Sequence, residues 1–380
     1  MKNNRTFLEK LLDGAEVEWK PLINVASLTR GRVISKEYLA NNLGDYPVYS
    51  SQTVNNGEIG KINSFDFDGE FVSWTTDGAN AGTVFYRSGK FSITNVCGLI
   101  KIQNNLELNY KFLFYWLSIE AKNHVYSGMG NPKLMSHQME KILIPIPPLS
   151  VQTEIVKILD ALTALTSELT SELTLRRKQY EYYREKLLSH NDSENSSQQK
   201  VDKDKLFSTS NIQWLHLNEI YKFQYGIGNK IPTIGGEYPV YGSNGIVGSH
   251  NEYNSEDAPV IGHIGAYAGI VNWAEGKHFV TYNGIICNKI NDNVNSRYAY
   301  YLLLSQNFID KANKASQPFI SYDILNKCIV PVPPIEEQQR IVSILDKFEA
   351  LTNSITEGLP LAIEQSQKRY EYYRELLLSF

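Results

Sequence analysis

Two stretches of the chain place apolar residues at alternating steps of three and four. The first begins near Ser150, and its seam positions are Ile155, Leu159, Leu162, Thr166, Leu169, Leu173, Arg176, Tyr180, Tyr183 and Leu187. This heptad spacing puts the seam on one face of a helix that needs a partner. Because the prolines before it cannot continue a helix backwards, Ser150 is the predicted N-cap. At ~1.5 Å per residue, we predict a helix roughly 55–60 Å long.

The second stretch has its seam at Ile341, Leu345, Phe348, Thr352, Ile355 and Leu359. Gly358 and Pro360 flank the last of these positions. Proline inside a helix removes a hydrogen bond and clashes with the preceding turn, so we predict a kink or short break there. A plain surface hinge is the alternative. Each stretch is the obvious partner of the other, which favours an antiparallel two-helix coiled coil.

The two stretches are parts of a longer internal repeat. Pro145-Ile146-Pro147-Pro148 opens the first and Pro331-Val332-Pro333-Pro334 opens the second, 186 residues later. Tyr-Glu-Tyr-Tyr-Arg-Glu closes both, at Tyr180 and at Tyr370, which are 190 residues apart. The second copy therefore carries four extra residues. Two copies of one structural unit suggest that one target is bound at two places.

The segments before the two helices also repeat, but more loosely. Tyr46-Pro47-Val48-Tyr49 recurs at Tyr238, and Trp19 matches Trp214. Alternating apolar runs predict strands at Phe71–Trp74, Thr83–Tyr86, Ala258–Ile261 and Ile285–Ile286, and amphipathic helices at Leu108–Tyr126 and Arg297–Ala312. The predicted fold class is α+β: two globular mixed α/β units separated by two long antiparallel helices, with pseudo-twofold symmetry.

Composition is that of a globular protein, with 42% hydrophobic and 21% charged residues in 380. The formal net charge of −4 does not point to nucleic acid, although a local basic face is enough for binding. The stretch Lys20–Lys141 has 12 Lys/Arg against 10 Asp/Glu. Three isolated cysteines, no apolar run of ~18 residues and a charged N-terminus lead us to expect a cytoplasmic protein without a membrane span.

No motif for catalysis is found. The chain has no phosphate-binding loop of the Gly-x-x-x-x-Gly-Lys-Ser/Thr type and no His/Cys cluster with metal spacing. Gly78-Ala79-Asn80-Ala81-Gly82 lacks the strand–turn–helix setting of a dinucleotide fingerprint. We therefore predict no catalytic residue, no bound metal and no cofactor.

The doubled motifs resemble the specificity subunit of type I restriction–modification systems over essentially the whole chain. The residues that carry the resemblance are Ile144–Gln152, Val330–Gln338 and the two Tyr-Glu-Tyr-Tyr-Arg-Glu helix ends. The resemblance implies a non-catalytic subunit that reads a bipartite double-stranded DNA target. It also implies that the helices dock methyltransferase subunits, two of them, and that restriction endonuclease/translocase subunits join through the complex.

The same resemblance gives the expected domains. Residues 1–147 and 209–333 are the target-recognition domains, 148–190 and 334–380 are spacer helices, and 191–208 is a polar linker. Side chains for reading bases are then expected in the Ser/Asn-rich loops, because Asn and Gln bond adenine and Arg and Lys bond guanine.

We predict DNA contacts in the first domain from Tyr49, Ser50, Ser51, Gln52, Asn55, Asn56, Thr76, Asn80, Asn131 and Lys133, the last two in the loop Gly128–Lys133. In the second domain we predict contacts from Tyr241, Ser243, Asn244, His263, Tyr267, Ser316 and Gln317. Loops of this composition can also be simple turns. The alternative function is a bivalent protein-interaction scaffold without DNA specificity, and an enzyme ranks third.

Overall fold

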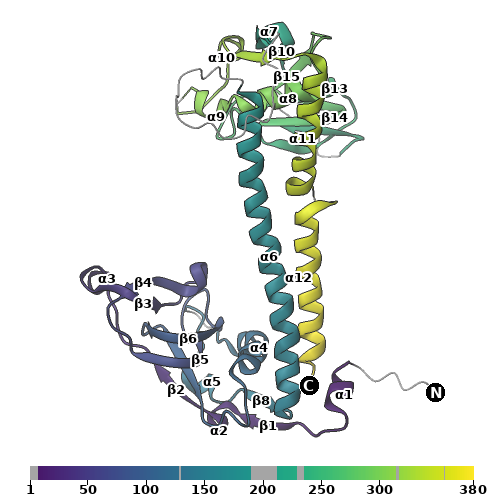
Figure 1. Cartoon of the computed structure of the whole chain (residues 1–380). Coiled ribbons are helices and arrows are strands. Elements are labelled where there is room, and N and C mark those ends of the chain that lie inside the picture. The colour runs from purple at the N-terminus through teal and green to yellow at the C-terminus, as the bar shows by residue number, and fades with distance from the viewer. Residues whose placement is uncertain (1–6, 128–129, 190–211, 229–234, 314–315, 355) are drawn as a thin grey trace, which may run out of the picture. The chain divides into compact units, whose positions relative to one another are not determined.

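A computed structural model describes residues 7–127, 130–189, 212–228, 235–313, 316–354 and 356–380. The predicted linker 191–208, Gly128 and the seam position Ile355 lie outside these residues. The chain forms two compact units (Figure 1). Unit 1 is Met1–Leu169 with Ile363–Phe380, and unit 2 is Thr170–Ala362.

The centre of unit 1 is a six-stranded sheet in the order β2-β7-β5-β6-β3-β4. Its neighbours are antiparallel except β3 and β6, which are parallel. Its strands are β2 (Ala26–Arg30), β3 (Leu43–Tyr49), β4 (Glu58–Ile62), β5 (Phe67–Thr75), β6 (Val84–Ile93) and β7 (Cys97–Ile102). The helices of its globular part are α1 (Phe7–Leu12), α2 (Leu22–Val25), α3 (Lys36–Asn41), α4 (Tyr110–Glu120) and α5 (Ser136–Met139), with 3-10 turns η1 (Val54–Gly57) and η2 (Ala121–His124).

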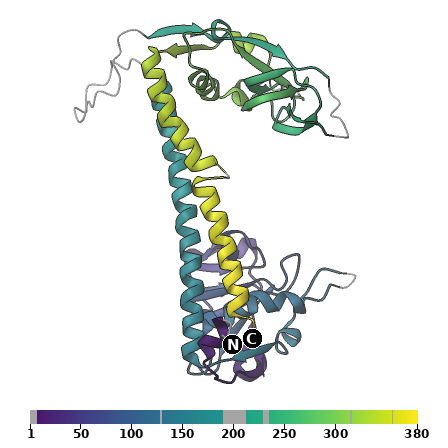
Figure 2. The same ribbon diagram turned by 90° about the vertical axis from the view of Figure 1, so that its right-hand side faces the viewer.

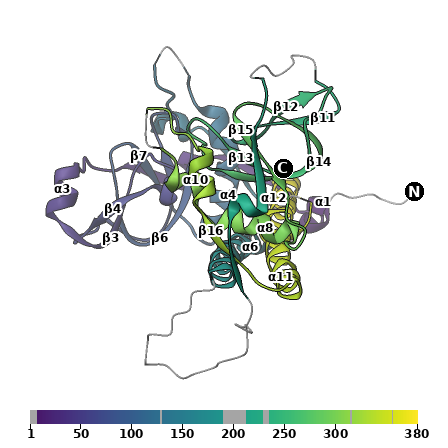
Figure 3. The same ribbon diagram turned by 90° about the horizontal axis from the view of Figure 1, so that it is seen from above.

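Unit 2 repeats this topology strand for strand. Its sheet has the order β10-β15-β13-β14-β11-β12, again with one parallel pair, β11 and β14; Figure 3 labels β11 to β15 from above. Its strands are β10 (Tyr221–Tyr225), β11 (Tyr238–Gly242), β12 (Gly245–His250), β13 (Ser255–Gly262), β14 (Val271–Val280) and β15 (Gly284–Lys289). Its helices are α7 (Leu217–Ile220), α8 (Ser296–Ser305), α9 (Phe308–Lys311) and α10 (Tyr322–Asn326).

A two-stranded sheet connects each globular part to its long helix. In unit 1, β1 (Glu18–Pro21) pairs with β8 (Leu143–Ile146), and in unit 2, β9 (Gln213–His216) pairs with β16 (Ile329–Val332). The register is the same in both: Trp19 faces Pro145, and Trp214 faces Pro331. The proline-rich segments that the sequence repeats are therefore strands that lead directly into the helices.

The helix α6 (Leu149–Leu188) is continuous over 40 residues. Its first part belongs to unit 1 and its last part to unit 2. In unit 1 it pairs with α12 (Gly358–Leu377), which belongs to this unit from Ile363 onwards (Figure 1). The hydroxyls of Thr166 on α6 and Ser366 on α12 are 2.8 Å apart. In unit 2 it pairs with α11 (Ile335–Asn353), where Tyr183 stacks on Phe348 at 5.8 Å.

The helices run antiparallel in unit 2, because Arg177 bonds the carbonyl of Thr352 while Tyr183, further along α6, meets Phe348. Every predicted seam position of α6 is buried or half-buried.

The predicted N-cap Ser150 is wrong, because the helix α6 already begins at Leu149 and the carbonyl of Pro148 accepts hydrogen bonds from the first amides. The helix α11 ends at Asn353 and α12 begins at Gly358, and Figure 2 shows the helical ribbon interrupted between them.

A buried glutamine fastens each globular part to its helix. Gln152 accepts a hydrogen bond from the amide of Asn109 at 2.9 Å and donates to the carbonyls of Pro147 and Glu107. In unit 2, Gln338 makes the same three bonds, to Asn295, Pro333 and Asn293. Both side chains are fully buried, so the bonds replace those lost to water.

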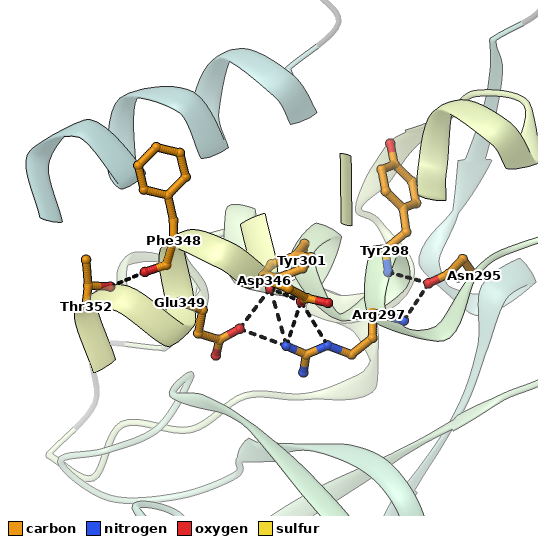
Figure 4. A network of polar contacts seen from close by, with 8 residues as sticks. All are labelled: Asn295, Arg297, Tyr298, Tyr301, Asp346, Phe348, Glu349 and Thr352. Atoms are coloured by element: carbon orange, nitrogen blue, oxygen red, sulfur yellow. Dashed lines mark hydrogen bonds and ion pairs between the residues drawn. The ribbon is translucent and has the colours of Figure 1, made fainter. Parts of the chain in front are cut away.

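A charged joint lies about two to three turns further along each helix. In unit 2, Arg297 on α8 donates to Asp346 at 3.0 Å and to Glu349 at 2.8 Å on α11 (Figure 4). Tyr301 donates to the same two carboxylates, and burial together with the bond to Asp346 raises the pKa of its hydroxyl. Unit 1 has Lys111, Tyr115 and Asp160 at the matching places.

The predicted helices of the globular parts are shorter than expected. The segment Leu108–Tyr126 contains α4 and a 3-10 turn, and Asn109 caps α4 by accepting the amides of Lys111 and Phe112. The segment Arg297–Ala312 is split into α8 and α9 at Asn307, whose φ is +47°. The predicted strands all lie inside observed ones, β5, β13 and β15 completely and β6 from Val84 onwards.

Candidate nucleic-acid interface

Three loops of unit 1 meet at one end of its sheet. The amide of Thr94 donates to the carbonyl of Tyr49 at 2.9 Å, which joins the ends of β3 and β6. Asn80 donates to the carbonyl of Ser51 at 3.1 Å, and the amide of Gly78 donates to Pro132 at 3.0 Å. The structure thus brings together the three predicted contact regions, which are far apart in the sequence.

The loop after β3 is held in a conformation that most residues avoid. Asn55 and Asn56 have φ values of +51° and +52°, in the left-handed region that asparagine tolerates. The carbonyl of Asn56 accepts a hydrogen bond of 2.8 Å from Arg87, and the amide of Ser50 closes the loop on Gly57 at 2.9 Å. The side-chain amide of Gln52 donates a hydrogen bond to the carbonyl of Glu58, so this side chain supports the loop.

Arg87 is a buried cation beneath that loop. Its guanidinium carbon lies 3.6 Å from the ring centroid of Tyr49, and its Nε donates to Ser73 at 3.0 Å. None of the salt bridges formed among the described residues includes it, and burial lowers its pKa to about 10. A charge so placed is stabilised by the aromatic face and by neutral oxygens, and it positions the loop rather than reaching solvent.

Arg30, at the end of β2, is a residue that the sequence analysis missed. Its Nη2 donates to Asn95 at 2.6 Å and to Thr76 at 3.2 Å, and its Nη1 lies 3.9 Å from the sulfur of Met135. It is exposed to solvent. No local motif marks it, because its partners lie 46 to 105 residues away along the chain.

The predicted residues of unit 1 differ in exposure. Those exposed are Asn55, Asn56, Asn131 and Lys133, and those half-buried are Tyr49, Ser50, Ser51, Gln52 and Asn80. Thr76 is completely buried, and its hydroxyl accepts the bond from Arg30. Thr76 therefore supports Arg30, and a DNA contact by Thr76 itself stays a prediction.

Unit 2 builds the same framework from different residues. The amide of Thr281 donates to Tyr241 at 3.0 Å, as Thr94 does to Tyr49. The amide of Gly265 donates to Pro318 at 2.8 Å, which repeats the bond between Gly78 and Pro132. The two loop clusters therefore share these two backbone hydrogen bonds.

The side chains of the second cluster are mainly aromatic. His263 takes the place of Thr76, since the amide of Ile320 donates to its carbonyl at 2.8 Å, as Leu134 does to Thr76. Its ring lies 4.3 Å from that of Tyr225, which stacks on Tyr322 at 4.2 Å. Tyr241 and His263 are buried, Ser243 is half-buried, and those exposed are Asn244, Tyr267, Ser316 and Gln317.

The loop after β11 is much shorter than its counterpart. Ser243 and Asn244 form a two-residue connection between β11 and β12, with Gly242 opposite Gly245. The buried arginine is missing as well, because the pairing register places Ala274 where unit 1 has Arg87. Unit 2 therefore needs no buried arginine to hold this loop.

Side-chain amides and hydroxyls at the end of each sheet, together with a guanidinium in unit 1, can form hydrogen bonds to base edges. Among the described residues, no group of three His, Cys, Asp or Glu side chains is placed to hold a metal ion. Of the helices in the described ranges, none is long and apolar enough to cross a membrane.

These features define a class of protein: a doubled α+β scaffold with two equivalent loop surfaces that carry different side chains. The chain belongs to the family described as the type I restriction modification DNA specificity domain, whose sequence model matches residues 15–176 and 217–365. This membership confirms the resemblance drawn from the repeated motifs.

Several relatives match over nearly their whole length. The chain is 39% identical, over 100% of both chains, to a Haemophilus influenzae protein assigned as a type I restriction enzyme specificity subunit. It is 33% identical to the EcoR124I/EcoR124II specificity subunit of Escherichia coli, over 99% of this chain and 97% of that one. The crystal structure of a type I system S subunit from M. genitalium has the same fold, with a TM-score of 0.63 at 19% identity over 100% of this chain and 96% of that chain.

Proposed function

We propose that this specificity subunit reads a bipartite DNA target, with one half-site for each unit. The observation that carries the proposal is the pair of loop clusters, in which the backbone hydrogen bonds are repeated and the side chains are not. A shared framework keeps both clusters competent to face a duplex, while the different side chains give each its own base preference.

In this proposal residues 1–147 and 209–333 are the recognition domains, and the helices in 148–190 and 334–380 are the spacer. The base contacts come from the exposed and half-buried members of each cluster. In unit 1 these are Tyr49, Ser50, Ser51, Gln52, Asn55, Asn56, Asn80, Asn131 and Lys133, and in unit 2 they are Ser243, Asn244, Tyr267, Ser316 and Gln317. The buried residues Thr76, Tyr241 and His263 act through their neighbours.

Two methyltransferase subunits dock on the helices and the short sheets beside them. Both units expose the same apolar side chains there: Trp19 (43%) and Leu143 (50%) in unit 1 match Trp214 (53%) and Ile329 (51%) in unit 2. The helix residues Tyr182 and Tyr372 are exposed at equivalent places. In unit 2, Trp214 and Ile329 border a cavity of about 720 Å³. Apolar surface kept in both copies favours the same partner at both.

Methyl transfer and cleavage belong to the partner subunits in this proposal. The restriction endonuclease/translocase subunits join through the assembled complex. The isolated chain then binds DNA weakly, because its net charge of −4 offers little general attraction to phosphates. Specific binding is expected once the methyltransferase subunits are bound.

The test is methylation sequencing of host DNA with and without this chain, in the presence of the methyltransferase subunit. A bipartite methylated motif should appear only with the chain. A second arm replaces Trp214–Lys327 by the corresponding segment of a foreign relative, which should change one half of the motif. The half read by Trp19–Lys141 is the internal control. Changes in both halves by a folded and assembled protein would overturn the one-unit, one-half assignment.

A further inference from the structure

We propose that Arg30 reads a guanine in the half-site of unit 1, and that the equivalent position in unit 2, Tyr225, gives that unit a different preference. The inference rests on the proposed function and assigns the residue at which the two units differ most in chemistry. Arg30 lies among the three convergent loops, and it was not among the residues expected from the sequence.

The pairing register makes Arg30 and Tyr225 equivalent. Arg30 is the last residue of β2 and lies opposite Gly98, which in turn lies opposite Trp74. Tyr225 is the last residue of β10 and lies opposite Ile285, which in turn lies opposite Ile261. Two residues beyond Trp74 and Ile261 the chain reaches Thr76 and His263, and each of these contacts the end residue of its own unit.

A glycine fixes the backbone after this position in both units. A Cβ on Gly31 would lie 2.2 Å from the carbonyl oxygen of Ile93, and one on Gly226 would lie 2.1 Å from that of Thr281. Such distances are far below van der Waals contact, so only glycine permits the close approach. The amides of both glycines bond to the neighbouring strand, to Cys97 and to Gly284. The side chain before each glycine therefore starts from the same place.

Arg30 is held in place but keeps donors for a ligand. Neutral oxygens of Thr76 and Asn95 accept from its Nη2, whereas within the described ranges Nη1 has only the weak sulfur acceptor of Met135. No carboxylate is among these partners, so the charge of this exposed guanidinium is not neutralised. A rigid guanidinium fork fits the O6 and N7 acceptors of guanine in the major groove.

The other two arginines near the loops are occupied differently. Arg32 is bound by Asp66, with Nε 2.9 Å from one carboxylate oxygen and 3.1 Å from the other. Arg87 is buried beneath the loop after β3. Of these three arginines, Arg30 is the one that is exposed, is held in place by hydrogen bonds and still has donors available for a ligand.

Unit 2 has an aromatic stack where unit 1 has this cation. The amide of Tyr225 donates to the hydroxyl of Tyr322 at 2.7 Å, and their rings stack at 4.2 Å and 14°. An aromatic ring cannot donate two parallel hydrogen bonds to guanine. The half-site of unit 2 therefore has no guanine specified through this position.

The experiment uses the full chain assembled with its methyltransferase subunit and compares Arg30→Met, Arg30→Lys and Arg32→Met. Arg30→Met keeps an unbranched apolar stem but removes the donors and the charge. Arg32→Met removes the same charge two residues away and is the matched control. The measurements are genomic methylation sequencing and binding to duplexes that carry each base at each position of the motif.

In the wild-type motif we expect a guanine, on either strand, in the half read by unit 1. Arg30→Met should lower the discrimination for that guanine by roughly 5- to 150-fold and leave the other half and the gap unchanged. Arg30→Lys should fall between Arg30→Met and the wild type. Arg32→Met should keep the wild-type motif.

Three results would overturn the inference: no guanine in that half, an unchanged motif with Arg30→Met, or an equal loss of binding to all sequences, which marks a phosphate contact. If Arg30→Met does not assemble, Arg30→Lys decides: an assembled Arg30→Lys complex with weaker discrimination for the guanine supports the inference, whereas an unchanged base preference, or loss of assembly with this variant as well, means a structural role. Failure of the proposed function gives a different result, because the wild-type chain would then produce no bipartite motif.

Discussion

At the scale of single residues, Arg87 supplies a prediction about how the first loop is positioned. We expect Arg87→Met to free the carbonyl of Asn56 and to loosen the loop that closes between Ser50 and Gly57. The amide of Ser50 should then exchange its hydrogen roughly 5- to 100-fold faster, since one bond to a charged group and its support are lost. Hydrogen exchange measured on the assembled wild type and variant checks this.

The melting temperature of Arg87→Met need not fall, because burial that lowers the pKa of Arg87 means that the folded protein disfavours the charge. The base preference of unit 1 should nevertheless relax, while that of unit 2 stays. The amide of Thr94, bonded to Tyr49, is the internal control and should keep its protection. Unchanged exchange at Ser50 would show that Arg87 does not hold the loop.

The sequence predicted the loops better than it predicted the roles of their residues. Asn55, Asn56, Asn131 and Ser316 are exposed at the expected ends of the sheets, because Ser/Asn-rich segments leave the core. Thr76 and His263 are buried, because each follows a strand by one residue and still lies inside the sheet's edge. Arg30 could not be found, since it meets Thr76 and Met135 only through the tertiary fold.

At the scale of elements, the buried glutamine joint gives a prediction about stability. Gln338→Leu removes the partner of the amide of Asn295 and of the carbonyl of Pro333 in a buried setting. We expect a loss of about 2–3 kcal/mol in the free energy of unfolding of unit 2, because these backbone groups cannot reach water. Urea unfolding followed by circular dichroism measures it.

The neighbouring Gln339 is a matched control, because it is exposed on the same helix. Gln339→Leu should change the stability by no more than about 0.5 kcal/mol. Equal effects of the two substitutions would mean that the cost comes from leucine at the start of α11, and the joint would then have no special role.

The long helices were predictable because a heptad seam is a local pattern that repeats for ten positions in α6. The strands were predicted only in part. Phe71–Trp74 is four residues of the nine-residue β5, in which Asp68, Gly69 and Glu70 are exposed and carry no strand pattern. The parallel pairing of β3 with β6 could not be read at all, because register depends on contacts between distant segments.

At the scale of the whole molecule, the internal repeat was the most informative feature of the sequence, because it predicted two units of the same topology. It also foretold four extra residues in the second copy. The structure shows how they are accommodated. Four residues, from Ser354 to Glu357, separate α11 from α12, and α11 and α12 together hold 39 helical residues against 40 in α6. The extra residues add chain without adding helical length.

This arrangement leads to a prediction about the gap between the two half-sites. If helix length sets that gap, removing 354–357 should leave it unchanged, because these residues contribute no helical rise. Removing one heptad from each helix should shorten it. The windows 163–169 and 363–369 are centred on the facing pair Thr166 and Ser366, and a seven-residue deletion keeps the seam in phase. At ~1.5 Å per residue the loss is about 10 Å, or about three base pairs at ~3.4 Å each.

Methylation sequencing of cells that carry each deletion, with the methyltransferase subunit present, measures the gap directly. Both half-sites should keep their sequences in each variant, because the loop clusters are untouched. A gap that shrinks when 354–357 is removed would mean that the break itself contributes to the spacing. A gap that survives the paired heptad deletion, in a protein that still assembles, would mean that the helices do not measure the distance. Comparing the two deletions thus shows whether the gap between the half-sites depends on the length of the helices or on the number of residues in the chain.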